Sequence, residues 1–175
     1  MSETRIEGRY VCAVLDSVAE VSPVFESRAE EILADAGIES PEPSETYDTG
    51  AFASALSSMV EAAGETTVTR AGEEMVDRNE EITSRTDFES GFATLREQHA
   101  AVHRSFDPDR AGQYRRERVG ERRHRVAAFG EHTYPEPLVR GAVEGVVEVT
   151  ESPPVVEFES TRPADDEAFA FVVTW

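Results

Sequence analysis

Apolar residues recur every three or four positions through the first 108 residues, which is the spacing of one face of an amphipathic helix. A first helix is predicted over residues 9–21, and Pro23 interrupts it. Its apolar face consists of four residues: Val11, Val14, Leu15 and Val18. The same periodicity predicts four further helices, over residues 25–36, 49–63, 66–77 and 88–106. Residues 1–108 are therefore expected to be mainly helical.

After Pro108 the apolar residues alternate with polar ones, which is typical of strands that expose one face. Four strands and one helix are predicted in the order β-β-α-β-β: residues 113–119, 122–129, 135–152, 155–161 and 168–175. We therefore predict an α+β fold in which residues 1–175 form a single domain. In it, an N-terminal helical layer (1–108) packs on a C-terminal antiparallel sheet (109–175).

The charge of the chain is extreme. Aspartate and glutamate number 36 against 17 basic residues, every basic residue is arginine, and the formal charge is −19. In multimolar salt the Debye length falls to about 3 Å or less, so such a surface does not repel itself and stays strongly hydrated. The composition therefore indicates a protein of an extreme halophile, and it leaves the activity open.

The sequence also bounds where the protein works. No apolar run approaches the ~20 residues of a transmembrane helix, and the start of the chain, Met1 to Thr4, lacks the basic and apolar regions of a signal peptide. The single Cys12 excludes an internal disulfide and a thiolate metal cluster, and its apolar neighbours favour a small buried side chain. We therefore expect a cytoplasmic protein that does not bind membranes.

Two histidines are the first candidates for chemistry. His99 and His103 lie four residues apart on one helix face, a spacing that is able to bind one metal, but no carboxylate completes a known motif around them. His99 continues the apolar stripe of Phe88, Phe92 and Leu95, so it is expected to face inward. It is either a buried polar residue of the core or an axial ligand of a cofactor.

The second candidate is a basic stretch in an acidic chain. Between Arg104 and Arg125 lie eight of the 17 arginines and only four acidic residues. Arginine binds planar anions such as carboxylates and phosphates, so this stretch is a candidate site for an anionic ligand or an acidic partner. Its candidate binding residues are Tyr114, Arg115, Arg116, Arg123 and Arg125. The alternative is that these arginines pair with acids within the chain.

Other function classes find no support in the sequence. No Gly-x-Ser-x-Gly motif and no glycine-rich loop after a strand occurs, so no enzyme is predicted. Nucleic acid is not expected as a partner, because high salt weakens contacts to phosphates severely.

Several strings resemble the superfamily that contains heme nitric-oxide/oxygen-binding (H-NOX) sensors and 4-vinyl-reductase-type ligand-binding domains. Tyr47-Asp48, followed by an amphipathic helix and Gly64, is similar to the start of the H-NOX helical core. The string from His99 to Phe106 is similar to the segment with the proximal heme histidine, and the chain from Pro137 to Trp175 resembles the shared C-terminal half. The segment from Gly112 to Gly120 is closer to heme-free bacterial relatives. The chain is thus identified as a divergent, haloarchaeal-type member.

The resemblance implies a non-enzymatic sensory or regulatory domain that binds heme or another planar anionic ligand, with His99 as ligand of the heme iron. One departure matters: the Tyr-x-Ser-x-Arg motif that holds the heme propionates in H-NOX proteins has no match between Val126 and Pro137. The alternative is a heme-free assembly module of the same fold. In that case the helix over 138–149 or an edge strand pairs with a protein partner or a second copy of the chain.

Overall fold

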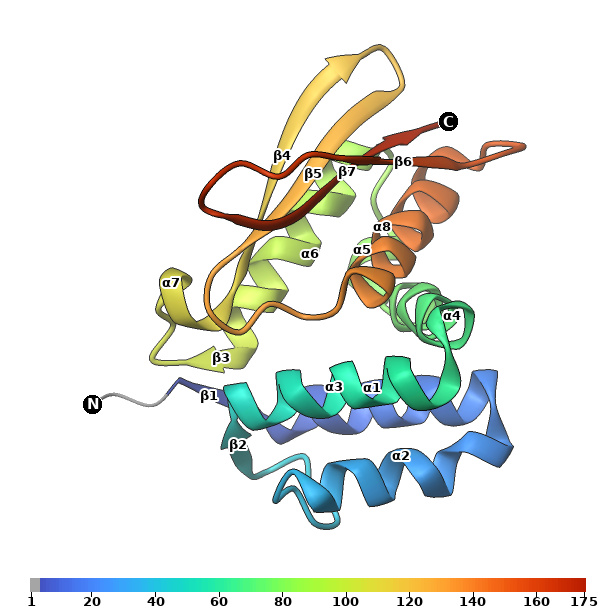
Figure 1. The fold of residues 1–175 in the computed structure, drawn as a ribbon. Helices are drawn as coiled ribbons and strands as arrows, with labels where there is room; N and C mark the ends of the chain where they lie inside the picture. The colour runs from blue at the N-terminus through green and yellow to red at the C-terminus, as the bar shows by residue number, and fades with distance from the viewer. Residues whose placement is uncertain (1–3) are drawn as a thin grey trace.

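The computed structural model describes residues 4–175; residues 1–3, which belong to the segment without signal-peptide character, lie outside this range. The predicted helical layer is present, and its long helices are α1 (Gly8–Val21), α2 (Pro23–Asp35), α3 (Thr49–Ala63) and α4 (Glu65–Asp77) (Figure 1). The start of α3 is fixed by the Asp48 side chain, which accepts a hydrogen bond from the backbone N–H of Ala51 at 2.8 Å.

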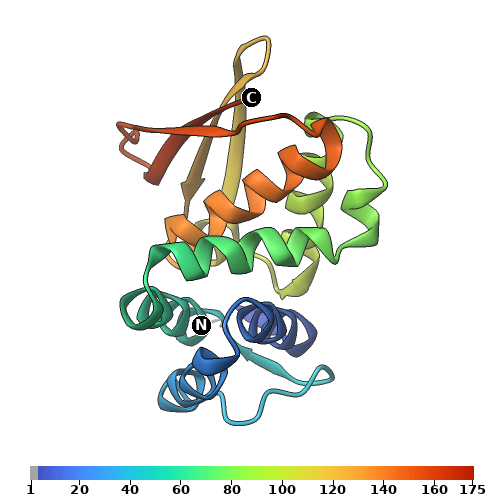
Figure 2. The same ribbon diagram turned by 90° about the vertical axis from the view of Figure 1, so that its right-hand side faces the viewer.

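The C-terminal part has the predicted β-β-α-β-β order. Its sheet is antiparallel, with strand order β4-β5-β7-β6. The strands are β4 (Gln113–Gly120), β5 (Arg123–Phe129), β6 (Glu157–Thr161) and β7 (Glu167–Thr174). Helix α8 (Glu136–Glu151) joins the two hairpins and, with α6 (Phe88–Val102), lies against one face of the sheet (Figure 2). The predicted α+β fold is confirmed.

A second, smaller sheet was not predicted. In it, β1 (Arg5–Glu7) pairs antiparallel with both β2 (Thr46–Asp48) and β3 (His103–Arg104). Strands of two or three residues carry no readable alternation, so the sequence gives no signal for them. The pattern predicted that this helix ends at residue 106. Because His103 enters the small sheet, α6 ends earlier, at Val102.

Two single-turn helices also lie in segments that were expected to be irregular. They are α5 (Glu80–Thr83) and α7 (Pro108–Ala111). Both start at a side-chain cap: Asn79 accepts from the backbone N–H of Ile82 at 3.3 Å, and Asp107 accepts from that of Asp109 at 3.1 Å. Helix α5 turns the chain from α4 to α6 and so closes one end of the interior.

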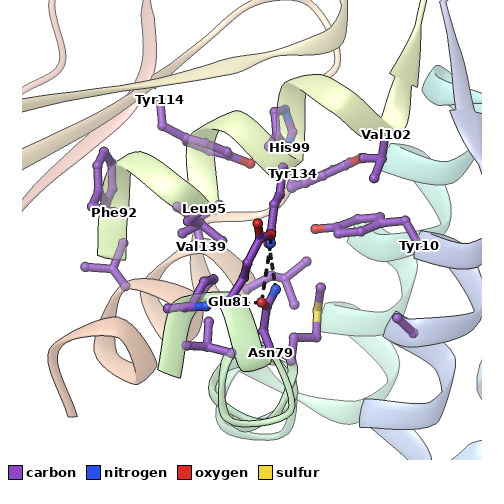
Figure 3. A pocket seen from close by; sticks show the side chains of 18 of the residues that line it. Tyr10, Asn79, Glu81, Phe92, Leu95, His99, Val102, Tyr114, Tyr134 and Val139 are labelled. Atoms are coloured by element: carbon purple, nitrogen blue, oxygen red, sulfur yellow. Dashed lines mark hydrogen bonds between the residues drawn. The ribbon is translucent and has the colours of Figure 1, made fainter. Parts of the chain in front are cut away.

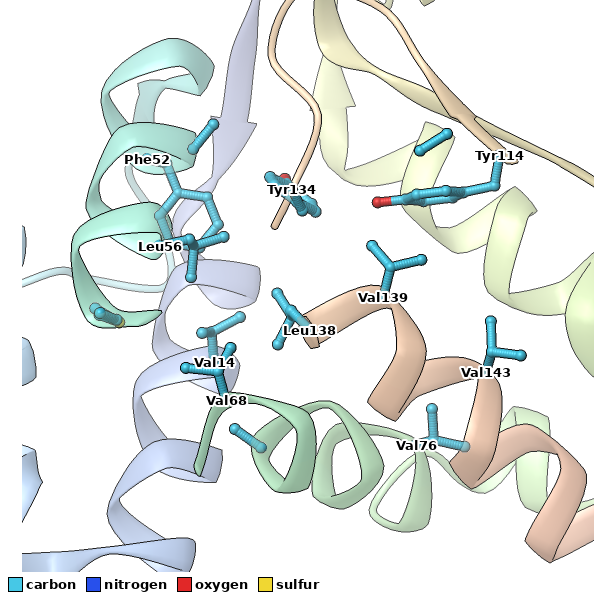
Figure 4. Close-up of a cluster of buried hydrophobic side chains, with 14 of the residues drawn as sticks. Val14, Phe52, Leu56, Val68, Val76, Tyr114, Tyr134, Leu138, Val139 and Val143 are labelled. Atoms are coloured by element: carbon cyan, nitrogen blue, oxygen red, sulfur yellow. The ribbon is translucent and has the colours of Figure 1, made fainter. Parts of the chain in front are cut away.

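Helices α4 and α8 pack with their backbones close together (Figure 2). Glycine makes this approach possible, because a Cβ at Gly141 would overlap the carbonyl oxygen of Thr69, and one at Gly72 would overlap that of Leu138. A continuous cluster of buried apolar side chains then joins the helical layer to the sheet (Figure 4). This contact fixes the position of α8, whose remaining face is directed toward the interior between α6 and the sheet.

The exposed surface is polar with few apolar exceptions. Large exposed apolar side chains within residues 4–175 are Val24, Val119 and Val155, which belong to three different segments. No helix in this range is long and apolar enough to span a bilayer.

Candidate functional site

A cavity of about 440 Å³ lies between the helical layer and the C-terminal part (Figure 3). Its walls come from α1, α4, α5, α6, β4 and α8, so both the helical layer and the C-terminal part contribute to it. Most of the lining is apolar, and it includes Phe92, Leu95, Val139 and Val143. A cavity of this size and character is typical of small-molecule sites.

His99 lies in the wall that α6 contributes, and its side chain is buried. Its Nε2 lies 3.1 Å from the carbonyl oxygen of Gly112. A carbonyl oxygen only accepts, so Nε2 carries a hydrogen and donates it. Burial first, and the neighbouring His103 second, lower the pKa of His99 to about 3, although the carbonyls of Gly112 and Ala111 act in the opposite direction. The imidazole is therefore neutral at physiological pH.

His103 lies one helical turn from His99, outside the lining of the cavity, and has both ring nitrogens engaged. Its Nδ1 donates to the backbone carbonyl of His99 at 2.6 Å, and its Nε2 accepts from the Tyr134 hydroxyl at 3.0 Å. Burial lowers the pKa of His103. No cluster of three or more metal-ligating side chains occurs within residues 4–175. The geometry therefore gives no support to a metal bound by His99 and His103 together.

Three tyrosines give the cavity its aromatic walls. Tyr134 stacks on Tyr10, with ring centroids 6.0 Å apart, and lies edge-on to His99 at 5.3 Å; Tyr114 lies edge-on to His99 at 4.9 Å. The hydroxyls of Tyr10 and Tyr114 point toward one another across the cavity (Figure 3). Unlike Tyr134, neither has a hydrogen-bond partner within residues 4–175. Burial raises the pKa of both phenols, so they stay protonated.

One edge of the cavity is polar. The side chains of Asn79 and Gln98 hydrogen-bond each other, with Asn79 Nδ2 donating to Gln98 Oε1 at 2.6 Å, and Gln98 Nε2 also donates to the carboxylate of Glu81. The exposed Arg9 also borders the cavity and pairs with Glu7. This edge therefore carries the carboxylate of Glu81 and the guanidinium of Arg9, and the charge of Arg9 is already paired with Glu7.

The four candidate arginines do not line this cavity. Three of them, Arg115, Arg123 and Arg125, point to the outer face of the sheet, because alternate residues of a strand face opposite sides. There they pair with acids: Arg115 with Asp166 at 3.3 Å, Arg123 with Glu159 at 3.0 Å, and Arg125 with Glu167. This outcome matches the alternative in which the arginines pair within the chain.

Arg116 faces inward but lies away from the cavity. Its guanidinium pairs with Glu89 at 3.1 Å and donates to Nδ1 of His124 at 3.0 Å. His124 stacks on Trp175, with centroids 5.4 Å apart, and burial lowers its pKa. Arg116 thus joins β4 to the start of α6, and of the residues proposed from the sequence only His99 and Tyr114 reach the cavity.

Residues that the sequence analysis did not single out complete the site. They are Tyr10, Asn79, Gln98 and Tyr134. Tyr10 lies four residues before Val14, so helical periodicity alone places it on the buried face of α1. Tyr134 lies in the connection before α8, where no periodic pattern applies, so only the tertiary structure reveals it.

The side chains present do not fit heme. A neutral buried imidazole beside an apolar cavity suits the chemistry of an axial ligand. However, Nε2 of His99 is occupied by its bond to Gly112, and the ring is enclosed by Tyr114, Tyr134 and His103. The two anionic propionates also find only Arg9, which already pairs with Glu7.

No protein-family model and no curated protein matches the sequence. Solved structures match its fold. The oxygen complex of an oxygen-binding H-NOX domain related to soluble guanylate cyclases superposes with a TM-score of 0.68, at 11% identity, over 97% of this chain and 94% of that chain. A Cs H-NOX variant with 4-cyano-L-phenylalanine superposes with a TM-score of 0.69, at 12% identity, over 97% and 96%. A variant H-NOX of T. tengcongensis reaches 0.68, at 11% identity, over 97% of each chain. This chain therefore has the fold of H-NOX domains.

Proposed function

We propose that this protein is a non-enzymatic sensory or regulatory domain that binds a small molecule in the cavity between its helical layer and its sheet. The observation that carries the proposal is the cavity of about 440 Å³, with aromatic walls and unpaired hydroxyl groups directed into it. The composition supports a further part of the proposal, that the protein works in the cytoplasm at high salt.

The structural neighbours support a ligand-binding role without fixing the ligand. One is described as oxygen-binding and related to soluble guanylate cyclases, and another concerns how porphyrin distortion modulates the redox potential of heme. In this chain the interior of the same fold is lined by tyrosines, and the imidazole of His99 is already hydrogen-bonded. We infer that a small molecule other than heme binds in this cavity.

The position of the cavity supports a regulatory role. Its lining includes Tyr10 near the start of α1 and Val143 in α8, so a bound ligand contacts both the helical layer and the C-terminal part. A ligand that contacts two parts of a protein stabilises the arrangement in which both contacts are made. Binding would thereby stabilise the contact between the helical layer and the C-terminal part, and a partner protein would respond to this change.

The assembly-module alternative is less well supported. One of the two surfaces suggested for it, the apolar face of the helix over 138–149, is not free, because the buried residues of α8 pack against α4 and α6. The outer strands β4 and β6 remain as surfaces for a second copy or a protein partner. Sedimentation in high salt tests this: a mass that rises with concentration would favour assembly.

A neutral fluorescent probe tests the cavity. We expect N-phenyl-1-naphthylamine to bind saturably, with one site per chain, because the walls are apolar. Val139→Trp places a large ring in the cavity and should weaken binding by about tenfold or more. Val155→Trp adds the same ring at an exposed position and should leave binding unchanged. Equal binding by both variants would overturn the proposal.

Hemin is the second arm of the test. We expect it to give no sharp Soret band and to titrate identically against the wild type and His99→Ala, because Nε2 of His99 is engaged. A Soret band that disappears in His99→Ala would instead establish a heme-binding domain and would contradict the fit described above.

A further inference from the structure

Two hydroxyl groups that face the cavity have no hydrogen-bond partner within residues 4–175. Tyr114 is only 7% exposed, yet its hydroxyl has no hydrogen bond within residues 4–175, and the same holds for the half-buried Tyr10. Neither hydroxyl oxygen is fully enclosed by protein atoms, so each is accessible to a molecule in the cavity. The hydroxyls approach from opposite walls, one from β4 and one from α1 (Figure 3).

The charge around the cavity selects against ions. An anion would meet the carboxylate of Glu81 and only one cation, Arg9, which already pairs with Glu7. A cation would have Glu81 alone, and that carboxylate already accepts a hydrogen bond from Gln98. Because transfer of an unpaired ion into an apolar site is very costly, a neutral ligand is favoured.

The walls also limit the shape of the ligand. Aliphatic side chains such as Leu95 and Val139 lie between five aromatic rings that line the space, those of Tyr10, Phe92, His99, Tyr114 and Tyr134. Aromatic walls favour flat, conjugated molecules, which pack against ring faces and edges. Water is able to bond the two hydroxyls in the free protein, and a ligand with two acceptor oxygens replaces it without loss of hydrogen bonds.

We infer that the ligand is an uncharged, planar conjugated molecule with an acceptor oxygen at each of two opposite ends, as in a quinone, and that Tyr10 and Tyr114 each donate a hydrogen bond to one of these oxygens. This inference rests on the proposed function, since it names the ligand class of the same cavity. It differs from the expectation of a planar anion that the arginines suggested, because those arginines are paired elsewhere.

The test compares two probes of the same shape by calorimetry in high salt. They are 2,3-dimethyl-1,4-naphthoquinone and 1,2,3,4-tetramethylnaphthalene, in which methyl groups replace both carbonyl oxygens. The ring substituents of the quinone also block addition of the Cys12 thiol. We expect the quinone to bind about tenfold more tightly or better, because only it satisfies the two hydroxyls.

Single substitutions then assign the two bonds. Tyr10→Phe and Tyr114→Phe should each weaken quinone binding about tenfold and leave binding of the hydrocarbon unchanged. Both variants should keep the wild-type melting temperature, since neither hydroxyl bonds to another residue within residues 4–175. Tyr134→Phe serves as the contrast, because it loses the bond to His103 and should lower the melting temperature.

The outcomes separate this inference from the proposed function. If both probes bind equally and the tyrosine variants have no effect, the assignment of the ligand class is wrong while the cavity remains a binding site. If neither probe binds and N-phenyl-1-naphthylamine does not bind either, the proposed function itself fails. Preference for an anionic probe such as 1,4-naphthalenedicarboxylate would also overturn the inference.

Discussion

The cavity and the outer face of the sheet treat polar groups in opposite ways. In the aromatic walls of the cavity the titratable groups are neutral, and two hydroxyls are unpaired: His99 has a pKa of about 3, and burial keeps the phenols of Tyr10 and Tyr114 protonated. On the sheet the groups are charged and matched, as in the pair of Arg125 with Glu167. The basic stretch that suggested a ligand site is thus consumed by pairing within the chain.

This contrast indicates which polar groups are available to bind a ligand. A paired charge has its partner already, and a ligand would have to displace it, whereas an unpaired polar group in an apolar cavity gains a hydrogen bond when a ligand arrives. Residue type alone favoured the arginines as ligand-binding residues. The hydrogen bonds and ion pairs in the structure favour the tyrosines instead.

The largest expected effect concerns the unpaired acids over the whole surface. The net charge of −19 leaves many carboxylates without a counter-charge, so lowering salt from about 3 M to about 0.1 M should sharply reduce stability as the Debye length grows. Circular-dichroism melts at several salt concentrations measure this. A melting temperature that does not change would refute the halophilic interpretation.

Breaking the best-matched charge on the sheet should have the next largest effect. The carboxylate of Glu167 is only 2% exposed and accepts from Arg125 and from the backbone N–H of Ala164. We expect Glu167→Ala to lower the free energy of unfolding by about 3 kcal/mol, since it leaves the largely buried Arg125 unpaired. The exposed Glu159, the partner of Arg123, is the control, and Glu159→Ala should cost less than about 1 kcal/mol.

The same pair has a defined pH dependence. The Arg125 hydrogen bonds hold the pKa of Glu167 at about 2, below its ordinary value of 4.5. Its contribution is therefore complete above pH 4.5 and is lost as the pH falls toward 2. Equal stability losses for Glu167→Ala at pH 7 and pH 2 would contradict this assignment.

Lowering the pH should reduce stability through His99 in the cavity at a higher pH than through Glu167 on the sheet. The pKa of His99 falls from 6.5 to about 3 because of burial, so the unfolded chain takes up a proton below pH 6.5 that the folded one refuses. Stability should fall by roughly 2 kcal/mol between pH 7 and pH 5 from this group. Denaturant titrations of His99→Leu in the same salt should have a pH slope that is shallower by about one proton, and an unchanged slope would disprove the burial argument.

The smallest effect concerns an acid that is neither exposed nor paired. Burial first, and then Glu144 and Glu148 on α8, raise the pKa of Glu73 on α4 to about 7. Its ionisation therefore opposes folding above pH 7 and has no effect below pH 4.5. We expect Glu73→Gln to stabilise the protein by about 1 kcal/mol at pH 8 and to lose this advantage at pH 4.5. Glu74→Gln, which breaks the pair with Arg78, should bring no gain at either pH.

The sequence by itself determined the fold class, because periodicity is local. The long helices, the four strands of the main sheet and their β-β-α-β-β order were all readable, since burial of one face requires period 3.6 or 2. The inward orientation of His99 followed from the same rule. The resemblance of a few strings to H-NOX proteins agreed with the fold that was found.

Only the tertiary structure decided the site. The partners of the arginines lie far along the chain, as with Arg125 and Glu167, so the sequence could not show that these charges are already matched. The sheet β2-β1-β3 depends on pairing between segments too short to carry a pattern. Tyr10, Tyr114 and Tyr134 come from α1, β4 and a connecting loop, and their convergence depends on how these elements pack. A binding cavity is a property of packing, which sequence periodicity does not encode.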